Sequence, residues 1–80
     1  MISPVHLRIL RFLAEGARLR WSEQNSAYYL SHVDPFSRRT VERQSEAMIL
    51  FLQREGVLDE GCRITRKGRA VLAGEKRARH

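Results

Sequence analysis

Residues 36–45 read Phe36-Ser37-Arg38-Arg39-Thr40-Val41-Glu42-Arg43-Gln44-Ser45 and lead into the apolar run Ala47-Met48-Ile49-Leu50-Phe51-Leu52. The first half is polar and rich in arginine, whereas the second half is apolar on nearly every side. A helix divided in this way packs one end into a core and leaves the other end outside it, as recognition helices do. Ser37 is a capping residue, and Phe36 and Val41 have the spacing of a hydrophobic staple. The pattern therefore predicts a helix from about Arg38 to Glu55, ended by Gly56, with a shorter helix starting at the cap Ser45 as the alternative.

The residues before this stretch predict a scaffold helix and one ambiguous segment. Ser3 can cap the first helix, Pro4 suits its first position, and Gly16 marks its end. Residues 18–33 have two interpretations. Residues 18–21 alternate as in a strand and residues 27–30 are rich in aromatics, which favours a β-hairpin. A helix over residues 23–33, capped by Ser22, is the preferred interpretation, and the hairpin stays open.

The residues after Gly56 predict a small ribbon and a last helix. Residues 57–58 and 63–65 can pair as a two-stranded wing around the turn at residues 59–61. Thr65 can cap a helix that Gly74 closes. The predicted class is α+β, with three or four helices and a short wing. Residues 2–74 form one domain and residues 75–80 form a disordered basic tail.

Charge points to an anionic partner. The chain of 80 residues carries a net charge of +6. Residues 1–61 are neutral, so the excess lies in residues 62–80, where it would attract a polyanion. Thirteen of the fifteen basic residues are arginine, which suits bidentate contacts to phosphate and guanine. A single cysteine, Cys62, excludes an intramolecular disulfide and a multi-cysteine zinc site. No apolar run approaches the roughly 18 residues that span a bilayer, so we expect a cytoplasmic protein that does not enter membranes.

Three short motifs together resemble the winged helix-turn-helix superfamily. They are Arg39-Thr40-Val41, then Phe51-Leu52-Gln53-Arg54-Glu55-Gly56-Val57-Leu58, then Arg63-Ile64-Thr65-Arg66-Lys67-Gly68-Arg69-Ala70-Val71-Leu72. The likeness is to small MarR-like and PadR-like regulators. In two respects the chain departs from them: residues 40–56 are about one helical turn too long, and the wing is short and acidic at its tip. Under the hairpin interpretation, residues 14–19 followed by Tyr28 and Leu30 are similar to YjhX-like small bacterial proteins, a family described as toxin-like.

The residues and the resemblance together predict sequence-specific binding of double-stranded DNA by a small transcriptional regulator. The helix would present arginine, glutamine and threonine to the major groove, and the wing and last helix would contact phosphates. The expected DNA-binding residues are Arg38, Arg39, Thr40, Arg43, Gln44, Arg63, Arg66, Lys67 and Arg69. A protein-interaction factor, toxin-like or inhibitory, on the same scaffold is the alternative. We expect no enzyme, cofactor or metal, and a homodimer or a protein partner stays open.

Overall fold

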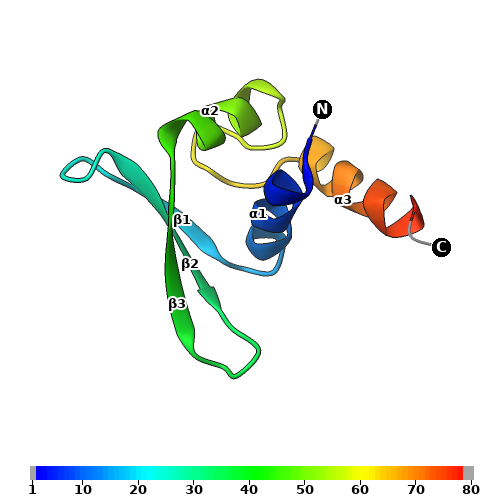
Figure 1. Ribbon diagram of the computed structural model, residues 1–80. Coiled ribbons are helices and arrows are strands. Elements are labelled where there is room, and N and C mark those ends of the chain that lie inside the picture. Colours follow the sequence, from blue (N-terminus) through cyan, green and yellow to red (C-terminus); the bar gives the residue numbers. More distant parts are fainter. Residues whose placement is uncertain (1, 79–80) are drawn as a thin grey trace.

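The computed structural model describes residues 2–78, with side chains described for residues 2–74 (Figure 1). Within these residues the chain forms three helices and one three-stranded antiparallel sheet, so the predicted α+β class is confirmed. The order along the chain is α1 (Pro4–Ala14), β1 (Arg18–Ser22), β2 (Ala27–Val33), β3 (Arg39–Gln44), α2 (Glu46–Arg54) and α3 (Arg66–Ala78).

Helix α1 follows the prediction. Pro4 is its first residue and Ser3 its N-cap, whose backbone N–H donates to His6 Nδ1 at 3.1 Å. The helix stops at Ala14, shortly before Gly16. It buries Ile9 and Leu10 in the core.

Residues 18–33 form the hairpin of β1 and β2, so the preferred helix over residues 23–33 was wrong and its alternative is confirmed. Pairing explains this outcome. Leu19 lies opposite Leu30, which is fully buried, and Trp21 lies opposite Tyr28 at a ring distance of 4.9 Å. These cross-strand contacts stabilise a pleated sheet, and a helix would not form them.

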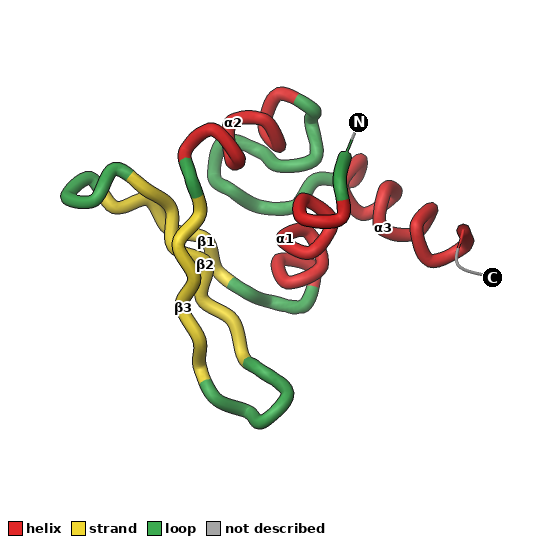
Figure 2. Tube along the Cα trace, in the orientation of Figure 1, coloured by secondary structure: helices red, strands yellow, loops and turns green. Residues whose placement is uncertain are grey.

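The predicted helix from Arg38 to Glu55 was also wrong in its first half, because residues 39–44 form strand β3. This strand pairs antiparallel with β2, from Val33 opposite Arg39 to Tyr28 opposite Gln44. The residues expected at a helix start form the connecting turn instead (Figure 2). Ser37 has a φ of 63°, far from the extended backbone of an N-cap, and Phe36 is 77% exposed and staples nothing.

Helix α2 begins where the shorter alternative placed it. Ser45 is the N-cap, and its Oγ accepts a hydrogen bond from the backbone N–H of Met48 at 3.2 Å. Gly56 follows the helix with a φ of +78°, a conformation that glycine adopts without steric cost. The predicted stop at Gly56 is confirmed.

The predicted wing is reduced to one antiparallel bridge between Leu58 and Ile64. Thr65 caps α3 as predicted, since its Oγ1 accepts from the Gly68 N–H at 3.1 Å. Helix α3 continues through Gly74 to Ala78, so the predicted end at Gly74 was wrong. The predicted tail at residues 75–80 therefore begins as helix, and residues 79 and 80 lie outside the described residues.

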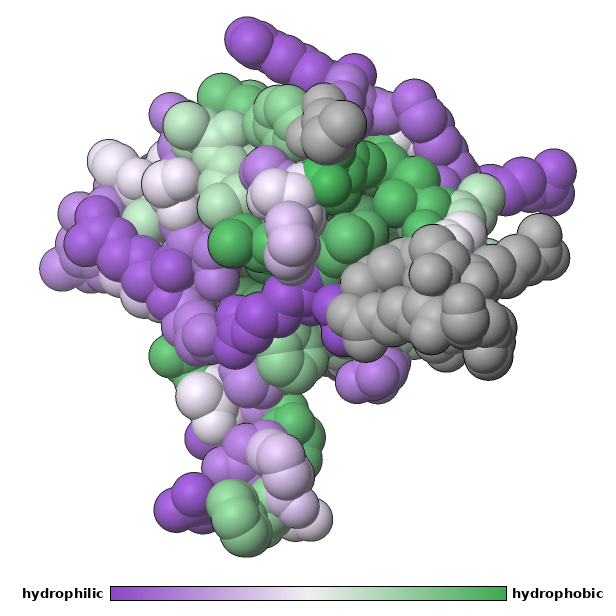
Figure 3. All heavy atoms as spheres, turned by 45° about the vertical axis from the view of Figure 1, so that its right-hand side comes forward, coloured by the Kyte–Doolittle hydropathy of each residue, from purple (hydrophilic) through white to green (hydrophobic). Residues whose placement is uncertain are grey.

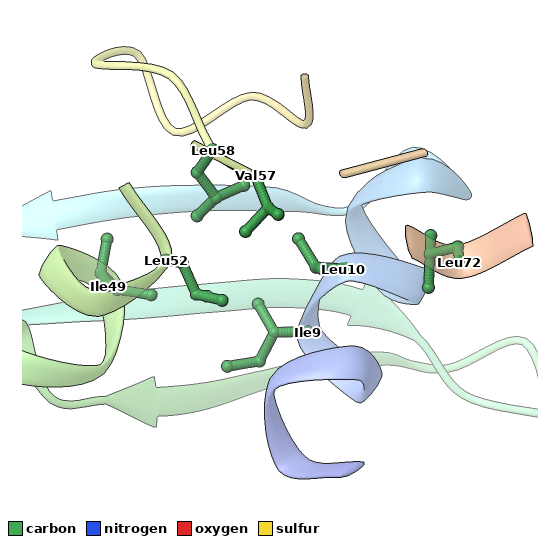
Figure 4. Close-up of a cluster of buried hydrophobic side chains, with 7 residues drawn as sticks. All are labelled: Ile9, Leu10, Ile49, Leu52, Val57, Leu58 and Leu72. Carbon is green, nitrogen blue, oxygen red and sulfur yellow. The ribbon is translucent and has the colours of Figure 1, made fainter. Parts of the chain in front are cut away.

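The core lies where the three helices come together (Figure 4), and Leu19 and Tyr28 of the sheet pack against it. Helix α1 is central, since it packs against α3, contacts β2 through the Phe12 ring and contacts β3 through Arg8. The β2–β3 hairpin extends beyond this core (Figure 1). The buried cluster consists of Ile9, Leu10, Ile49, Leu52, Val57, Leu58 and Leu72.

Candidate functional site

The sheet has one face toward the core and one toward solvent. Side chains alternate between the faces along each strand, and the exposure of β3 follows this alternation. The pairing register then gathers residues of all three strands on the outer side. We call this surface the arginine face, and it consists of Arg18, Arg20, Tyr29, Ser31, Val33, Arg39, Val41 and Arg43.

A hollow of about 870 Å³ lies on the arginine face. Every residue of the face except Arg43 lines it. Beyond the end of β1 it passes the free edge of β2 at His32 and reaches residues of α1 and of the following loop. Glu15 is the one carboxylate among the described residues that line it. Arg39 Nη1 donates to Ser31 Oγ at 3.2 Å, whereas Arg18, Arg20 and Arg43 form no salt bridge within the described chain. The face is therefore a basic surface with uncompensated charge.

A second hollow of about 430 Å³ lies beside β1, and we call it the edge hollow. Four consecutive residues, 17–20, line it on one side, and residues 61–64 line it on the other. Consecutive strand residues point to opposite faces, so a hollow that touches all of them lies at the strand's edge and not on a face. The remaining lining residues are Leu13 and Arg69, and no described residue around it carries a carboxylate.

The five DNA-binding residues predicted within residues 38–44 do not lie on one surface. Arg39 and Arg43 lie on the arginine face, whereas Thr40 and Gln44 alternate with them and point to the other side. Arg38 lies in the turn, where its Nε is 3.1 Å from Asp34 Oδ2. They do not form the single helical surface that the sequence predicted.

The other four predicted residues divide between two places. Arg63 and Arg69 line the edge hollow, and Arg66 and Lys67 are exposed in the first turn of α3. Arg18 and Arg20 border both hollows, and the prediction did not include them. The sequence held one signal for these two arginines. They alternate with Leu19 and Trp21, and in a strand this alternation places both arginines on one face.

A polar cluster joins α1 to the core side of the sheet. Glu42 Oε2 lies 2.7 Å from Arg8 Nη2 and 2.6 Å from Nε2 of His32, which is 7% exposed. The His32 ring stacks on Phe12 at 4.0 Å between centroids. The hydrogen bond from Arg8 lowers the pKa of Glu42, and burial of the carboxylate opposes this effect in part. The cluster links β2 and β3 to α1 on the core side of the sheet.

Neither a metal centre nor a membrane span is found within the described part of the chain. No three His, Cys, Asp or Glu side chains there gather as a metal site. No helix there has the length and apolar character needed to cross a membrane. Burial raises the pKa of the Cys62 thiol, which argues against a reactive thiolate.

Comparison of the chain with protein-family models, curated proteins and solved structures finds no match.

Proposed function

We propose that this chain binds double-stranded DNA through the arginine face and acts as a small transcriptional regulator. The observation that carries the proposal is the gathering of four arginines from the two outer strands, β1 and β3, on one exposed surface. No carboxylate occurs among the eight residues of that face. Such a surface attracts a polyanion, and arginine can make paired contacts to phosphate and to guanine.

The dimensions of a sheet suit the major groove. A two-stranded ribbon fits into a groove about 12 Å wide, and neighbouring strands are about 4.8 Å apart. Arg20, Tyr29 and Arg43 lie in one row across the three strands. If two adjacent strands enter the groove, the arginine of the third strand reaches the flanking phosphates. Base reading would then come from the sheet, and not from the helix that the sequence predicted.

The winged helix-turn-helix assignment remains part of this proposal. Helix α2, the Leu58–Ile64 bridge and α3 follow one another in the order that the resemblance implies. We infer a reduced form of that fold, in which an added three-stranded sheet carries the DNA contacts.

Fluorescence anisotropy of a labelled duplex, titrated at several salt concentrations, tests the proposal. Three or four phosphate contacts give a slope of log affinity against log salt of about −3 to −4. Arg39→Ala/Arg43→Ala should reduce the magnitude of that slope by about 2. The matched control, Arg66→Ala/Lys67→Ala, removes the same charge from α3 and should reduce it less. Equal losses in the two double variants, or binding without salt dependence, would refute the role of the face.

A protein-interaction factor is the second candidate, favoured by the apolar surface of the β2–β3 hairpin. Val33, Phe36 and Val41 are 56%, 77% and 59% exposed. Apolar and polar atoms are mixed on the hairpin where it projects from the body (Figure 3). Exposed apolar groups of this kind occur at protein interfaces. If this function is the principal one, duplex binding will be weak, indifferent to sequence and equal in the two double variants.

A further inference from the structure

We propose that the edge hollow binds an extended acidic peptide segment of a partner protein, which adds to β1 as a further strand of the sheet. The inference concerns β1, residues 61–64 and Arg69, and it does not depend on DNA binding by the arginine face.

The position of β1 makes strand addition possible. Within the described sheet β1 is a terminal strand, paired only with β2, so its other edge presents unpaired backbone N–H and C=O groups. The hollow lies along this edge, because Ala17, Arg18, Leu19 and Arg20 all border it. Strand β1 contains no proline that would interrupt pairing. An extended segment of about five residues matches its length.

The chemistry around the hollow selects an acidic segment. Arg18, Arg20, Arg63 and Arg69 surround it, and no described residue that lines it carries a carboxylate. Arg63 is 85% exposed, and its nearest carboxylate, on Asp59, is 3.9 Å from its Nε. That contact is long and solvated, so a peptide carboxylate can replace it at little cost.

The pattern of the segment follows from the two sides of β1. Arg18 and Arg20 point to the outer side, and Leu19 points to the core side together with the neighbouring apolar residues. Leu13 and Ile64 also line the hollow. In a strand added here, every second side chain faces the arginines, and the side chains between them face apolar groups. The segment that fits alternates acidic and aliphatic residues.

A nucleic acid is the less suitable occupant. No tyrosine, tryptophan or phenylalanine is among the described residues that line the edge hollow. Single-stranded nucleic acids gain much of their binding energy by stacking bases on such rings. A free strand edge offers hydrogen bonds that a peptide backbone matches and a sugar-phosphate backbone does not.

Peptide binding to the full chain tests the proposal without altering the protein. The probe is a fluorescein-labelled hexapeptide of alternating Asp and Val. Two further versions carry backbone N-methyl groups on alternate residues: one on every Asp, the other on every Val. Only one phase places its methyl groups toward β1. We expect that version to bind at least ten-fold more weakly than the parent and the other to lose less. Equal affinity of all three peptides would overturn the proposal, because charge attraction alone is indifferent to the backbone N–H.

Two further readouts locate the site. Cys62 lines the hollow, so the parent peptide should slow its alkylation by iodoacetamide at least five-fold. Arg63→Ala/Arg69→Ala should weaken peptide binding at least ten-fold, whereas Arg39→Ala/Arg43→Ala should leave it within two-fold. Each of three outcomes would refute the peptide site. The first is that the peptide does not protect Cys62, and the second is that both double variants lose equal affinity. The third is that oligothymidylate displaces the peptide and N-methylation has no effect. Loss of duplex binding in Arg39→Ala/Arg43→Ala bears only on the proposed function.

Discussion

Gly68, in the first turn of α3, marks the point where that helix meets the chain after α2. A Cβ atom added there would lie 2.5 Å from the carbonyl oxygen of Val57 and 2.7 Å from Cγ1 of Ile64. The Val57 oxygen also accepts the Thr65 N–H at 3.1 Å, which limits how far it can move. Gly68→Ala is therefore expected to push α3 away from this carbonyl.

Two opposing effects set the size of the loss. Alanine is better than glycine in a helix interior by about 0.8–1 kcal/mol. Overpacking a buried site costs about 1–3 kcal/mol, and contact with backbone places this site near the upper end. The net expectation for Gly68→Ala is a loss of about 2 kcal/mol. Gly74 lies later in the same helix with nothing within 4 Å of the added atom, so Gly74→Ala should gain about 0.5–1 kcal/mol.

Urea denaturation followed by far-ultraviolet circular dichroism measures both variants. The free energies of unfolding should differ by about 2–3 kcal/mol with unchanged dependence on urea, or by about 10–20 °C in Tm for a domain of this size. If Gly68→Ala raises the urea midpoint as Gly74→Ala does, α3 does not approach the Val57 carbonyl closely, and this prediction is refuted.

Three further outcomes are expected. Glu42→Gln should lower stability at pH 7 by about 1 kcal/mol. The pKa of Glu42 is lower in the folded protein than in the unfolded chain. The extra stability of the wild type is therefore present above the unfolded pKa and should disappear as the pH falls through the folded pKa. Urea midpoints of both proteins between pH 7 and pH 2 measure this difference. Ser45→Ala should lower the free energy of unfolding by about 1 kcal/mol in the same assay, because it removes the cap of α2, whereas Ser37→Ala should be nearly neutral. A larger loss for Ser37→Ala than for Ser45→Ala would support the long helix from Arg38 instead. Burial raises the pKa of Cys62, so iodoacetamide at pH 7.5 should modify it more slowly than a free cysteine, and an equal rate would contradict that burial.

The predictions that succeeded depended on residues that act within one turn of the chain. Ser3 and Pro4 begin α1, Thr65 begins α3, and Gly56 follows α2, each by local backbone chemistry. Such signals need no knowledge of distant partners. Two local signals misled. A glycine in open space inside a helix, such as Gly74, costs about 1 kcal/mol and does not end it. The cap signal at Ser37 falls in the β2–β3 turn, where this residue has a φ of 63°.

The wrong helix prediction for residues 39–44 came from a strand that forms only because it pairs with β2. Residues 39–44 contain one apolar residue, Val41, and it is exposed, so hydrophobic periodicity carries no strand signal there. Pairing with β2 supplies what the local sequence does not. The same pairing creates the arginine face, because residues 18–20 and 39–43 become neighbours only once the sheet exists. The preferred helix over residues 23–33 hid that surface, because it removes the strand that joins β1 to β3.

The packing of α1 on α3 has a consequence for synthesis of the protein. Ile9 and Leu10 leave the ribosome more than sixty residues before Leu72, which belongs to the same buried cluster. Until then the part of α1 that α3 covers stays exposed, while the β1–β2–β3 sheet, built from sequence neighbours, can already pair. Nascent chains that stall before α3 should therefore expose this apolar surface and depend on chaperones, whereas chains that include α3 should not.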